Sequence, residues 1–281
     1  MTLLDQDTPA QPAPQARASL SAEGIRIGYD RRVIIEELDA TVPEGSFTVI
    51  IGPNACGKST LLRALARLLP PQQGRVLLDG ADISGMKTKQ VATKLGLLPQ
   101  SSIAPEGITV ADLVARGRFP HQGMFDRWSA ADERAVTEAM AATRVTELSG
   151  RAVDELSGGQ RQRVWVAMAL AQETPTLLLD EPTTFLDISH QYELLELCRA
   201  LREEGGRTLV AVLHDLNQAA RFGTHLLVMK DGALVASGKP EDILTEELVA
   251  EVFDLPCRIV PDPVTGTPLV VPLDGAGRQR R

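Results

Sequence analysis

The chain has 281 residues, of which 43% are hydrophobic, so it is long enough to bury a full core as one large domain. Its 37 acidic residues outnumber 29 Lys and Arg residues, and the resulting net charge of −8 argues against nucleic acid as a partner. Its three cysteines lack the spacing of a zinc site, and no apolar run is long enough to span a membrane. We therefore expect a cytoplasmic protein without a structural disulfide, which another protein must anchor if it works at a membrane.

The N-terminal third of the chain is predicted to consist mainly of strands. Residues 1–18 are rich in Pro, Gln and Ala and are expected to form a disordered tail, so order should begin near Leu20. Residues 58–69 show helical spacing, and Pro70 and Pro71 are expected to end that helix. The strands expected in this part are 25–29, 33–42, 46–51, 75–78 and 95–98, the first two of them antiparallel.

Residues 101–155 change in character and predict a helical insert between Gln100 and Ser157. Strands and helices then alternate, which argues for a mainly parallel sheet with helices on both faces. Asp231 and Gly232 are a turn signal between the last two strands. The elements expected in this part are helices 112–117, 130–142, 145–148 and 159–172, strand 176–180, helix 189–204, strand 208–213, helix 215–222, and strands 225–229 and 233–236.

A glycine-rich loop follows the buried strand expected at 46–51, and it fits the phosphate-binding pattern G-x-x-x-x-G-K-[ST]. Glycine lets backbone N–H groups turn toward a phosphate, and the dipole of the following helix attracts the same anion. Lys58 would reach the β- and γ-phosphates, and the Ser59 hydroxyl would coordinate Mg²⁺. A capped glycine turn without a ligand is the alternative. The loop, called the phosphate loop below, consists of Gly52, Pro53, Asn54, Ala55, Cys56, Gly57, Lys58, Ser59 and Thr60.

Two residues of the phosphate loop raise questions of their own. Alanine disfavours positive φ angles, so Ala55 could alter the loop geometry. Cys56 lies among backbone N–H groups, a setting that can lower a thiol pKa, although a small neutral filler beside the phosphates is the favoured alternative.

Two acidic residues lie at the end of the buried strand expected at 176–180. Asp180 ends the strand, and a carboxylate there can reach a metal ion through water. Glu181 is the residue that we expect to polarise the attacking water. Both could instead be helix-capping acids, but open parallel sheets place their ligands at such strand ends.

A second motif opens the helix expected at 159–172. Its N–H groups and the helix dipole would point at an anion, and a plain N-cap is the alternative. This signature motif consists of Ser157, Gly158, Gly159 and Gln160. In this order, the phosphate loop, the signature motif and the strand ending at Asp180 and Glu181 resemble the ATP-binding cassette (ABC) ATPases.

The resemblance covers about residues 20–255 and has implications for the fold. It implies an α/β P-loop NTPase with a mainly parallel core sheet, an antiparallel β subdomain and a helical signature subdomain at about 101–172. Residues 19–255 would form the ATPase domain and 256–281 a C-terminal extension, of which 272–281 are expected to be frayed.

The resemblance also implies roles for single residues in a homodimer that binds two ATP molecules between its chains. The signature motif would contact the γ-phosphate of ATP held by the partner chain, and Asp187 lies in the loop that couples the two chains. His214 would contact the γ-phosphate, and Gln100 would be a hinge glutamine that contacts Mg²⁺ and water. Tyr29 is expected to stack on adenine, with a core tyrosine as the alternative. Structural or surface roles are expected for the other histidines, which are His121, His190 and His225.

A closer resemblance involves the segments 114–122, 179–191, 213–219 and 262–268. These resemble the ATPase subunits of ferric-siderophore importers, especially the ferric-enterobactin type, whose phosphate loop also carries Ala and Cys. The resemblance implies ATP and Mg²⁺ as cofactors and a peripheral position on the cytoplasmic face of the cell membrane. The partners would be membrane permease subunits and a substrate-binding protein, with no nucleic acid.

Three residues of the insert are candidate contacts of the permease, namely Arg116, Arg118 and Phe119, and a solvated helix face is the alternative for the arginines. Other functions remain open. The ATPase of a vitamin B12 or haem importer shares much of the pattern, and a soluble ABC ATPase of iron–sulfur cluster assembly differs mainly at 116–122. A nucleotide-binding scaffold without turnover is disfavoured because Glu181 and His214 are both present.

Overall fold

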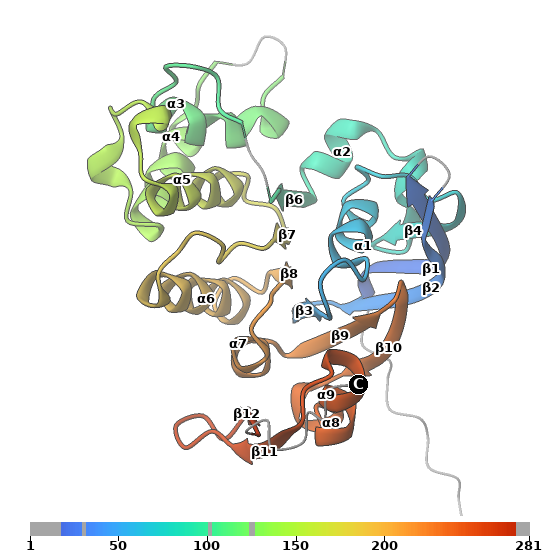
Figure 1. Ribbon diagram of the computed structural model, residues 1–281. Coiled ribbons are helices and arrows are strands. Elements are labelled where there is room, and N and C mark those ends of the chain that lie inside the picture. Colours follow the sequence, from blue (N-terminus) through green and yellow to red (C-terminus); the bar gives the residue numbers. More distant parts are fainter. Residues whose placement is uncertain (1–17, 30–31, 101–102, 124–126, 274–281) are drawn as a thin grey trace, which may run out of the picture.

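The computed structural model describes residues 18–29, 32–100, 103–123 and 127–273 (Figure 1). The predicted tail therefore lies outside the described residues apart from Ala18, which is already part of a strand, and most of the predicted frayed end lies outside them as well. Among the described residues, no helix combines the length and the apolar character that crossing a bilayer requires.

A six-stranded sheet forms the centre of the molecule, with the order β10-β9-β3-β8-β7-β6. The pairs from β9 to β6 are parallel, and β10 adds an antiparallel edge. Every residue of β3, β7 and β8 is buried, as expected for strands covered on both faces. The strands are β3 (Phe47–Ile51), β6 (Leu95–Leu98), β7 (Thr176–Asp180), β8 (Thr208–Val212), β9 (His225–Lys230) and β10 (Ala233–Gly238).

Side chains of the central strands alternate between two apolar cores. Val49 and Ile51 face the core that includes the helices of the insert, whereas Ile50 faces the core shared with α1 and the N-terminal strands. The helices that border the sheet are α1 (Lys58–Leu65), α5 (Gly158–Ala171), α6 (Ile188–Glu203) and α7 (Leu216–Phe222). The predicted mainly parallel sheet with helices on both faces is confirmed.

A four-stranded sheet with the order β2-β1-β4-β5 forms the antiparallel β subdomain. Its long first hairpin confirms the antiparallel pair expected from the sequence, although β1 begins earlier than predicted. A 3-10 helix, η1, and the short helix α2 follow the sheet. These elements are β1 (Ala18–Tyr29), β2 (Arg32–Pro43), β4 (Gln73–Leu78), β5 (Ala81–Asp82), η1 (Ile83–Gly85) and α2 (Thr88–Ala92).

Helix α1 is shorter than predicted. It ends at Leu65 and not at Leu69, because Arg67 adopts a left-handed conformation with φ of 59°. The N–H groups of Leu68 and Leu69 then both donate to the carbonyl of Arg63, which closes the helix end before the prolines are reached.

The insert between β6 and β7 is helical, as predicted, and forms a separate lobe beside the sheet (Figure 1). Helices α3 and α4 both pack against α5 in this lobe. Its elements before α5 are α3 (Val110–Ala115), the 3-10 helix η2 (Arg116–His121), α4 (Ala130–Ala142), and the 3-10 helices η3 (Thr146–Leu148) and η4 (Val153–Glu155).

The C-terminal segment packs on α7. The side-chain amide of Asn217 accepts from the N–H of Val270 at 2.7 Å and donates to its carbonyl at 3.2 Å, which fixes β12 against the helix. The elements here are α8 (Pro240–Ile243), α9 (Glu246–Phe253), β11 (Cys257–Pro261) and β12 (Pro268–Pro272), the last two paired as a hairpin.

Arg118 was predicted to be a permease contact or an exposed arginine, and both interpretations are wrong. Its side chain is only 6% exposed, and its guanidinium pairs with Asp132 of α4 at 2.9 Å. The Asp132 carboxylate also accepts from the hydroxyl of Ser129 at 2.7 Å. The pKa of Asp132 is lowered to about 2, most strongly by the hydrogen bond from Ser129 and next by the one from Arg118. Arg116 and Phe119 are exposed.

We predict that Asp132→Asn lowers the free energy of unfolding at pH 7 by about 2 kcal/mol, because it removes one partner of a buried cation. Since the folded-state pKa of Asp132 lies below its unfolded value, its contribution is complete above about pH 4 and is lost as pH falls toward 2. Urea unfolding at several pH values should show the difference from wild type shrinking toward acid. Asp154→Asn, at an exposed position of the same lobe, is the control. A difference that stays constant with pH would contradict this.

Candidate functional site

The phosphate loop connects the buried strand β3 to helix α1. Gly52 has φ of 155°, and a Cβ atom there would lie 2.2 Å from the carbonyl oxygen of Met229, so only glycine fits. Gly57 has φ of 106° and occupies the N-cap position of α1 without a side-chain cap. The N-terminal N–H groups of α1 therefore have no capping side chain, which is the arrangement that binds anions in proteins.

Ala55 and Cys56 behave differently within this loop. Ala55 does adopt a left-handed conformation, with φ of 63°, at a cost of about 1 kcal/mol relative to glycine. Cys56 is 5% exposed and packs in the core beneath the loop. Burial raises the pKa of its thiol, although Lys58 acts in the opposite direction. Cys56 is thus the small neutral residue of the favoured interpretation and has no lowered thiol pKa.

Lys58 and Ser59 begin α1 and turn toward polar partners. Lys58 is 5% exposed, and its ammonium group donates to the carbonyl oxygens of Gly52 at 2.8 Å and Pro53 at 2.7 Å. An ammonium has three donors, so one remains for a further acceptor. The hydroxyl of Ser59 donates to Asp180 Oδ1 at 2.8 Å.

Asp180 is 2% exposed at the end of β7. Burial raises its pKa, and the hydrogen bond from Ser59 opposes that shift. A hydroxyl and a carboxylate oxygen side by side are hard oxygen donors of the kind that Mg²⁺ prefers. The two side chains fit the predicted metal, and a cation there would replace the hydroxyl proton as the partner of the carboxylate.

Glu181 and His214 meet beside this pair. Parallel pairing aligns Asp180 with Val212, so the residues that follow β7 and β8 emerge at the same edge of the sheet. Glu181 has φ of 53°, and its Oε1 lies 2.9 Å from Nε2 of His214. The glutamate side chain is mostly buried, whereas the histidine side chain is 46% exposed. The two predicted functional groups are therefore in direct contact.

These side chains line one cavity of about 280 Å³, called the loop pocket. Two residues of its wall, Arg32 and Ile34, come from β2 and were not among the predicted site residues. Neither belongs to a motif, and β2 meets the loop where Ile34 packs against Gly57, with 3.4 Å between Cγ2 of Ile34 and a Cβ atom built on the glycine. The lining residues are Arg32, Ile34, Asn54, Ala55, Gly57, Lys58, Ser59, Thr60, Glu181 and His214.

The signature motif lies at a different pocket. Ser157 is the N-cap of α5, and its hydroxyl accepts from the N–H of Gln160 at 3.3 Å while Gln160 Oε1 accepts from the N–H of Ser157 at 3.1 Å. The cavity beside it, called the signature pocket, has about 380 Å³ and shares no lining residue with the loop pocket. Its lining residues are Ser157, Gly159, Gln160, Arg163, Phe185, Leu186, Asp187 and His190.

Asp187 is the N-cap of α6 at the edge of the signature pocket. Its carboxylate accepts from the N–H of His190 at 3.0 Å, from the hydroxyl of Ser189 at 3.0 Å and from Nδ1 of His190 at 2.6 Å. The backbone hydrogen bond from His190 contributes most to a lowered pKa of Asp187. Two of the other histidines have structural partners as well, since His121 bonds to Gln172 and His225 to Ser237.

Tyr29 and Gln100 line neither pocket. Tyr29 is 41% exposed at the end of β1, directly across from Arg32, so the core alternative does not describe it. Its hydroxyl accepts a long hydrogen bond of 3.4 Å from Arg63 of α1. Gln100 is exposed just beyond β6, and the next two residues, 101–102, lie outside the described part of the chain.

The chain matches the ABC transporter family over residues 35–184. It is 56% identical to the ferric enterobactin transport ATP-binding protein of Escherichia coli (strain K12), over 91% of this chain and 94% of the relative. It is 49% identical to a petrobactin import ATP-binding protein of Bacillus anthracis, over 94% of this chain and 96% of the relative. Among solved structures, a dimeric bacterial ABC transporter cassette aligns with a TM-score of 0.71 and 28% identity, over 78% of this chain and 98% of that one. The chain therefore belongs to the ABC transporter family, as one of its ATP-binding ATPase subunits.

Proposed function

We propose that this chain hydrolyses ATP to drive uptake of an iron(III)-siderophore complex through a membrane permease. The observation that carries the ATPase part is the convergence of Lys58, Ser59, Asp180, Glu181 and His214 on one edge of the sheet. The siderophore cargo rests on the two relatives, whose names state ferric enterobactin transport and petrobactin import.

ATP would bind with its phosphates at the start of α1. The phosphate loop offers its backbone N–H groups and the third donor of Lys58 to these anions, and the helix dipole adds to the attraction. Mg²⁺, held by Ser59 and Asp180 and reached by Gln100 when the site closes, would neutralise phosphate charge. Tyr29 stands at the hairpin beside Arg32, where an adenine ring could stack on it.

Glu181 is the general base or water-positioning group in this proposal. Its carboxylate is mostly buried and keeps one oxygen on His214 Nε2, which fixes the orientation of the side chain. The other oxygen accepts a long hydrogen bond of 3.4 Å from Thr184, its one hydrogen bond among the described residues, and can accept from a water molecule. His214, half exposed at the rim, would in turn contact the γ-phosphate.

The separation of the two pockets supports a shared site. The signature motif forms the N-terminus of helix α5, a feature that attracts anions, yet the loop pocket of the same chain contains none of its residues. Two chains arranged head to tail would place the motif of one against the ATP of the other. The ATPase domain 19–255, with helical subdomain 101–172 and extension 256–281, would form the homodimer.

The dimer would work on the cytoplasmic face of the membrane together with permease subunits and a substrate-binding protein. Arg116 and Phe119 are exposed on the helical lobe and remain the candidate permease contacts. In such a machine, closure around ATP moves the two helical lobes together and hydrolysis releases them.

We predict that Glu181→Gln leaves ATP binding intact and lowers kcat by about 10²- to 10⁴-fold, because an amide keeps the shape but cannot accept a proton. An ATP-stabilised dimer should then appear in size-exclusion chromatography. Glu193→Gln, which makes the same chemical change at an ion pair on α6, is the control and should behave like wild type. Turnover near the wild-type rate in the Glu181 variant would remove this residue from the proposed role.

A second prediction concerns the sharing of each site between two chains. Lys58→Ala and Ser157→Arg homodimers each have two damaged sites and should lose nearly all ATPase activity. A mixture of the two variants should regain activity, because a heterodimer combines both lesions in one site and leaves the other site intact. If heterodimers form but remain inactive and bind no ATP in an intact site, the head-to-tail arrangement is wrong.

A third prediction tests the cargo. Cells in which the gene is deleted should lose uptake of radioactive iron supplied as a siderophore complex, and the wild-type gene should restore it. The Glu181→Gln gene should not restore uptake. If siderophore uptake is retained while vitamin B12 or haem uptake is lost, the proposed siderophore cargo is wrong. The ATPase assignment would still stand. Unchanged uptake of all three would support a function outside import.

A further inference from the structure

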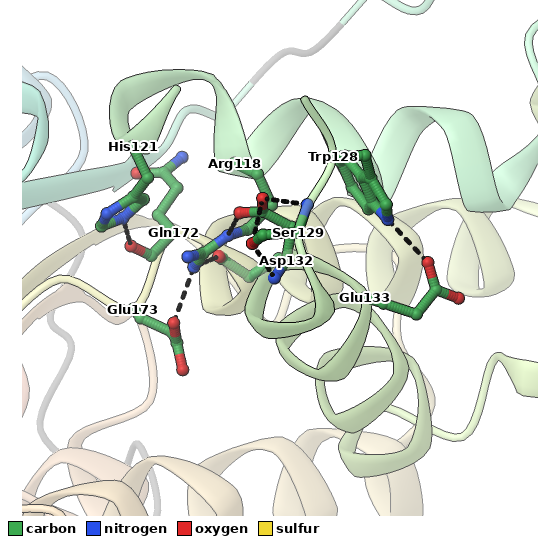
Figure 2. A network of polar contacts seen from close by, with 9 residues as sticks. Arg118, His121, Trp128, Ser129, Asp132, Glu133, Gln172 and Glu173 are labelled. Atoms are coloured by element: carbon green, nitrogen blue, oxygen red, sulfur yellow. Dashed lines mark hydrogen bonds and ion pairs between the residues drawn. The ribbon is translucent and has the colours of Figure 1, made fainter. Parts of the chain in front are cut away.

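The 3-10 helix η2 covers the C-terminal end of α5 (Figure 2). A Cβ atom on Gly117 would lie 2.3 Å from the carbonyl oxygen of Met168, so the backbone of η2 touches that of α5 directly. Arg118 Nη1 donates to the carbonyl of Ala171 at 2.7 Å, and His121 Nε2 donates to that of Gln172 at 2.6 Å. The last carbonyls of a helix have no donors within the helix, so η2 acts as its C-terminal cap.

The guanidinium of Arg118 lies between carboxylates from two different parts of the chain, as Figure 2 shows. Asp132, on α4, belongs to the same helical lobe and accepts from Nε at 2.9 Å. Glu173, in the connection from α5 to β7, accepts from Nη1 at 2.7 Å. One buried cation therefore joins η2 to α4, to the end of α5 and to the segment that enters the sheet.

Glu173 relates Arg118 to β7 and β8, the two strands that end near Asp180, Glu181 and His214. It lies just before β7, which ends at Asp180, and it interacts with Arg207, the residue directly before β8. Burial lowers the pKa of Arg207, and the negative charge of Glu173 counteracts that shift. Glu173 also adopts a left-handed conformation with φ of 48°, which fixes the direction of the chain at this point.

The opposite side of η2 is open. Phe119 is 63% exposed and Arg116 is exposed, so the same turn that Arg118 holds from within offers an apolar and a basic side chain outside. Neighbouring residues of one tight turn cannot move independently of each other. A displacement of the outer side must therefore act on Arg118 and on its partners.

We propose that Arg118 is a positioning residue that connects the exposed turn η2 to the signature helix α5 and, through Glu173, to the strands that carry Asp180, Glu181 and His214. Asp132 holds Arg118 within the helical lobe, and Glu173 carries the connection to the sheet. The proposal rests on the proposed function, because the connection matters when Ser157 must meet the ATP of a partner chain.

The two carboxylates should then have different roles. Without the Glu173 charge, α5 and Ser157 would sample more orientations relative to the sheet, and fewer encounters would give a closed dimer. Nucleotide binding to the phosphate loop should not change, because the loop meets β7 through the hydrogen bond from Ser59 to Asp180, at the end of the strand far from Glu173. The five residues of β7 span about 17 Å. Without the Asp132 charge, the lobe itself should lose stability.

The test compares Glu173→Gln, Asp132→Asn and Arg118→Lys in the full-length chain. For Glu173→Gln we expect an unchanged Kd for ATP, a kcat about threefold to tenfold lower, and a weaker ATP-dependent dimer when Glu181→Gln is also present. Arg118→Lys retains the charge but not the fork of donors, so its kcat should be intermediate. Asp132→Asn should mainly lower Tm. All activities are measured well below Tm, so that unfolding contributes nothing.

Glu193→Gln is the matched control, because it also removes a carboxylate that joins the lobe region to the core, through the exposed Arg144. A Glu173→Gln variant with wild-type kcat and dimer affinity would overturn the inference, and so would an equal loss in Glu193→Gln. A wild-type chain that neither hydrolyses ATP nor dimerises overturns the proposed function and this inference together. An active wild type with an unaffected Glu173 variant overturns this inference alone.

Discussion

Three buried strands, β3, β8 and β7, lie side by side and run in the same direction, and their pairing determines where chemistry can occur. Parallel strands end at one edge of the sheet. The phosphate loop after β3, Asp180 at the end of β7, Glu181 directly after it and His214 after β8 therefore all lie at that edge. Taken alone, each of these motifs could equally be interpreted as a helix cap or a turn. The hydrogen bond between Ser59 and Asp180 and the contact between Glu181 and His214 exist only because this pairing holds.

The helical lobe obeys a second constraint, which is the need to hold one helix at a defined orientation. Helix α5 begins at Ser157 and ends where η2 covers its last carbonyls. Within the lobe, α3 and α4 make apolar contacts along α5. The buried cation Arg118 adds a directional connection from the lobe to the sheet. Ion pairs of this kind add little net stability compared with apolar groups, so a role in orientation is a reason for placing one there.

Much of the fold and of the loop pocket could be predicted, because the signals are local. The phosphate loop, the acidic pair after β7 and the strand-helix alternation depend on neighbouring residues, and the structure places them as expected. The remaining features depend on distant partners. Arg118 is separated from Glu173 by 55 residues in sequence, so an Arg-Gly-Arg stretch at the end of an expected helix gave no sign of its burial.

Other differences have similar causes. Arg32 lines the loop pocket although it lies far from the phosphate loop in sequence and outside every motif, so no spacing reveals it. Helix α1 ends at Leu65, just before the left-handed Arg67. Sequence assigns that conformation more readily to glycine, so the pattern predicts that the helix continues to the prolines. Ala55 in the phosphate loop shows the same exception, since a non-glycine residue adopts the positive φ that the loop requires.

The central claim is that one chain supplies half of each ATP site, and a structure of the Glu181→Gln protein with ATP and Mg²⁺ tests it most directly. The account predicts a two-fold dimer in which the Ser157 hydroxyl of one chain lies about 3 Å from the γ-phosphate bound to Lys58 of the other. A structure in which ATP is bound to Lys58 while every Ser157 remains away from nucleotide would contradict it.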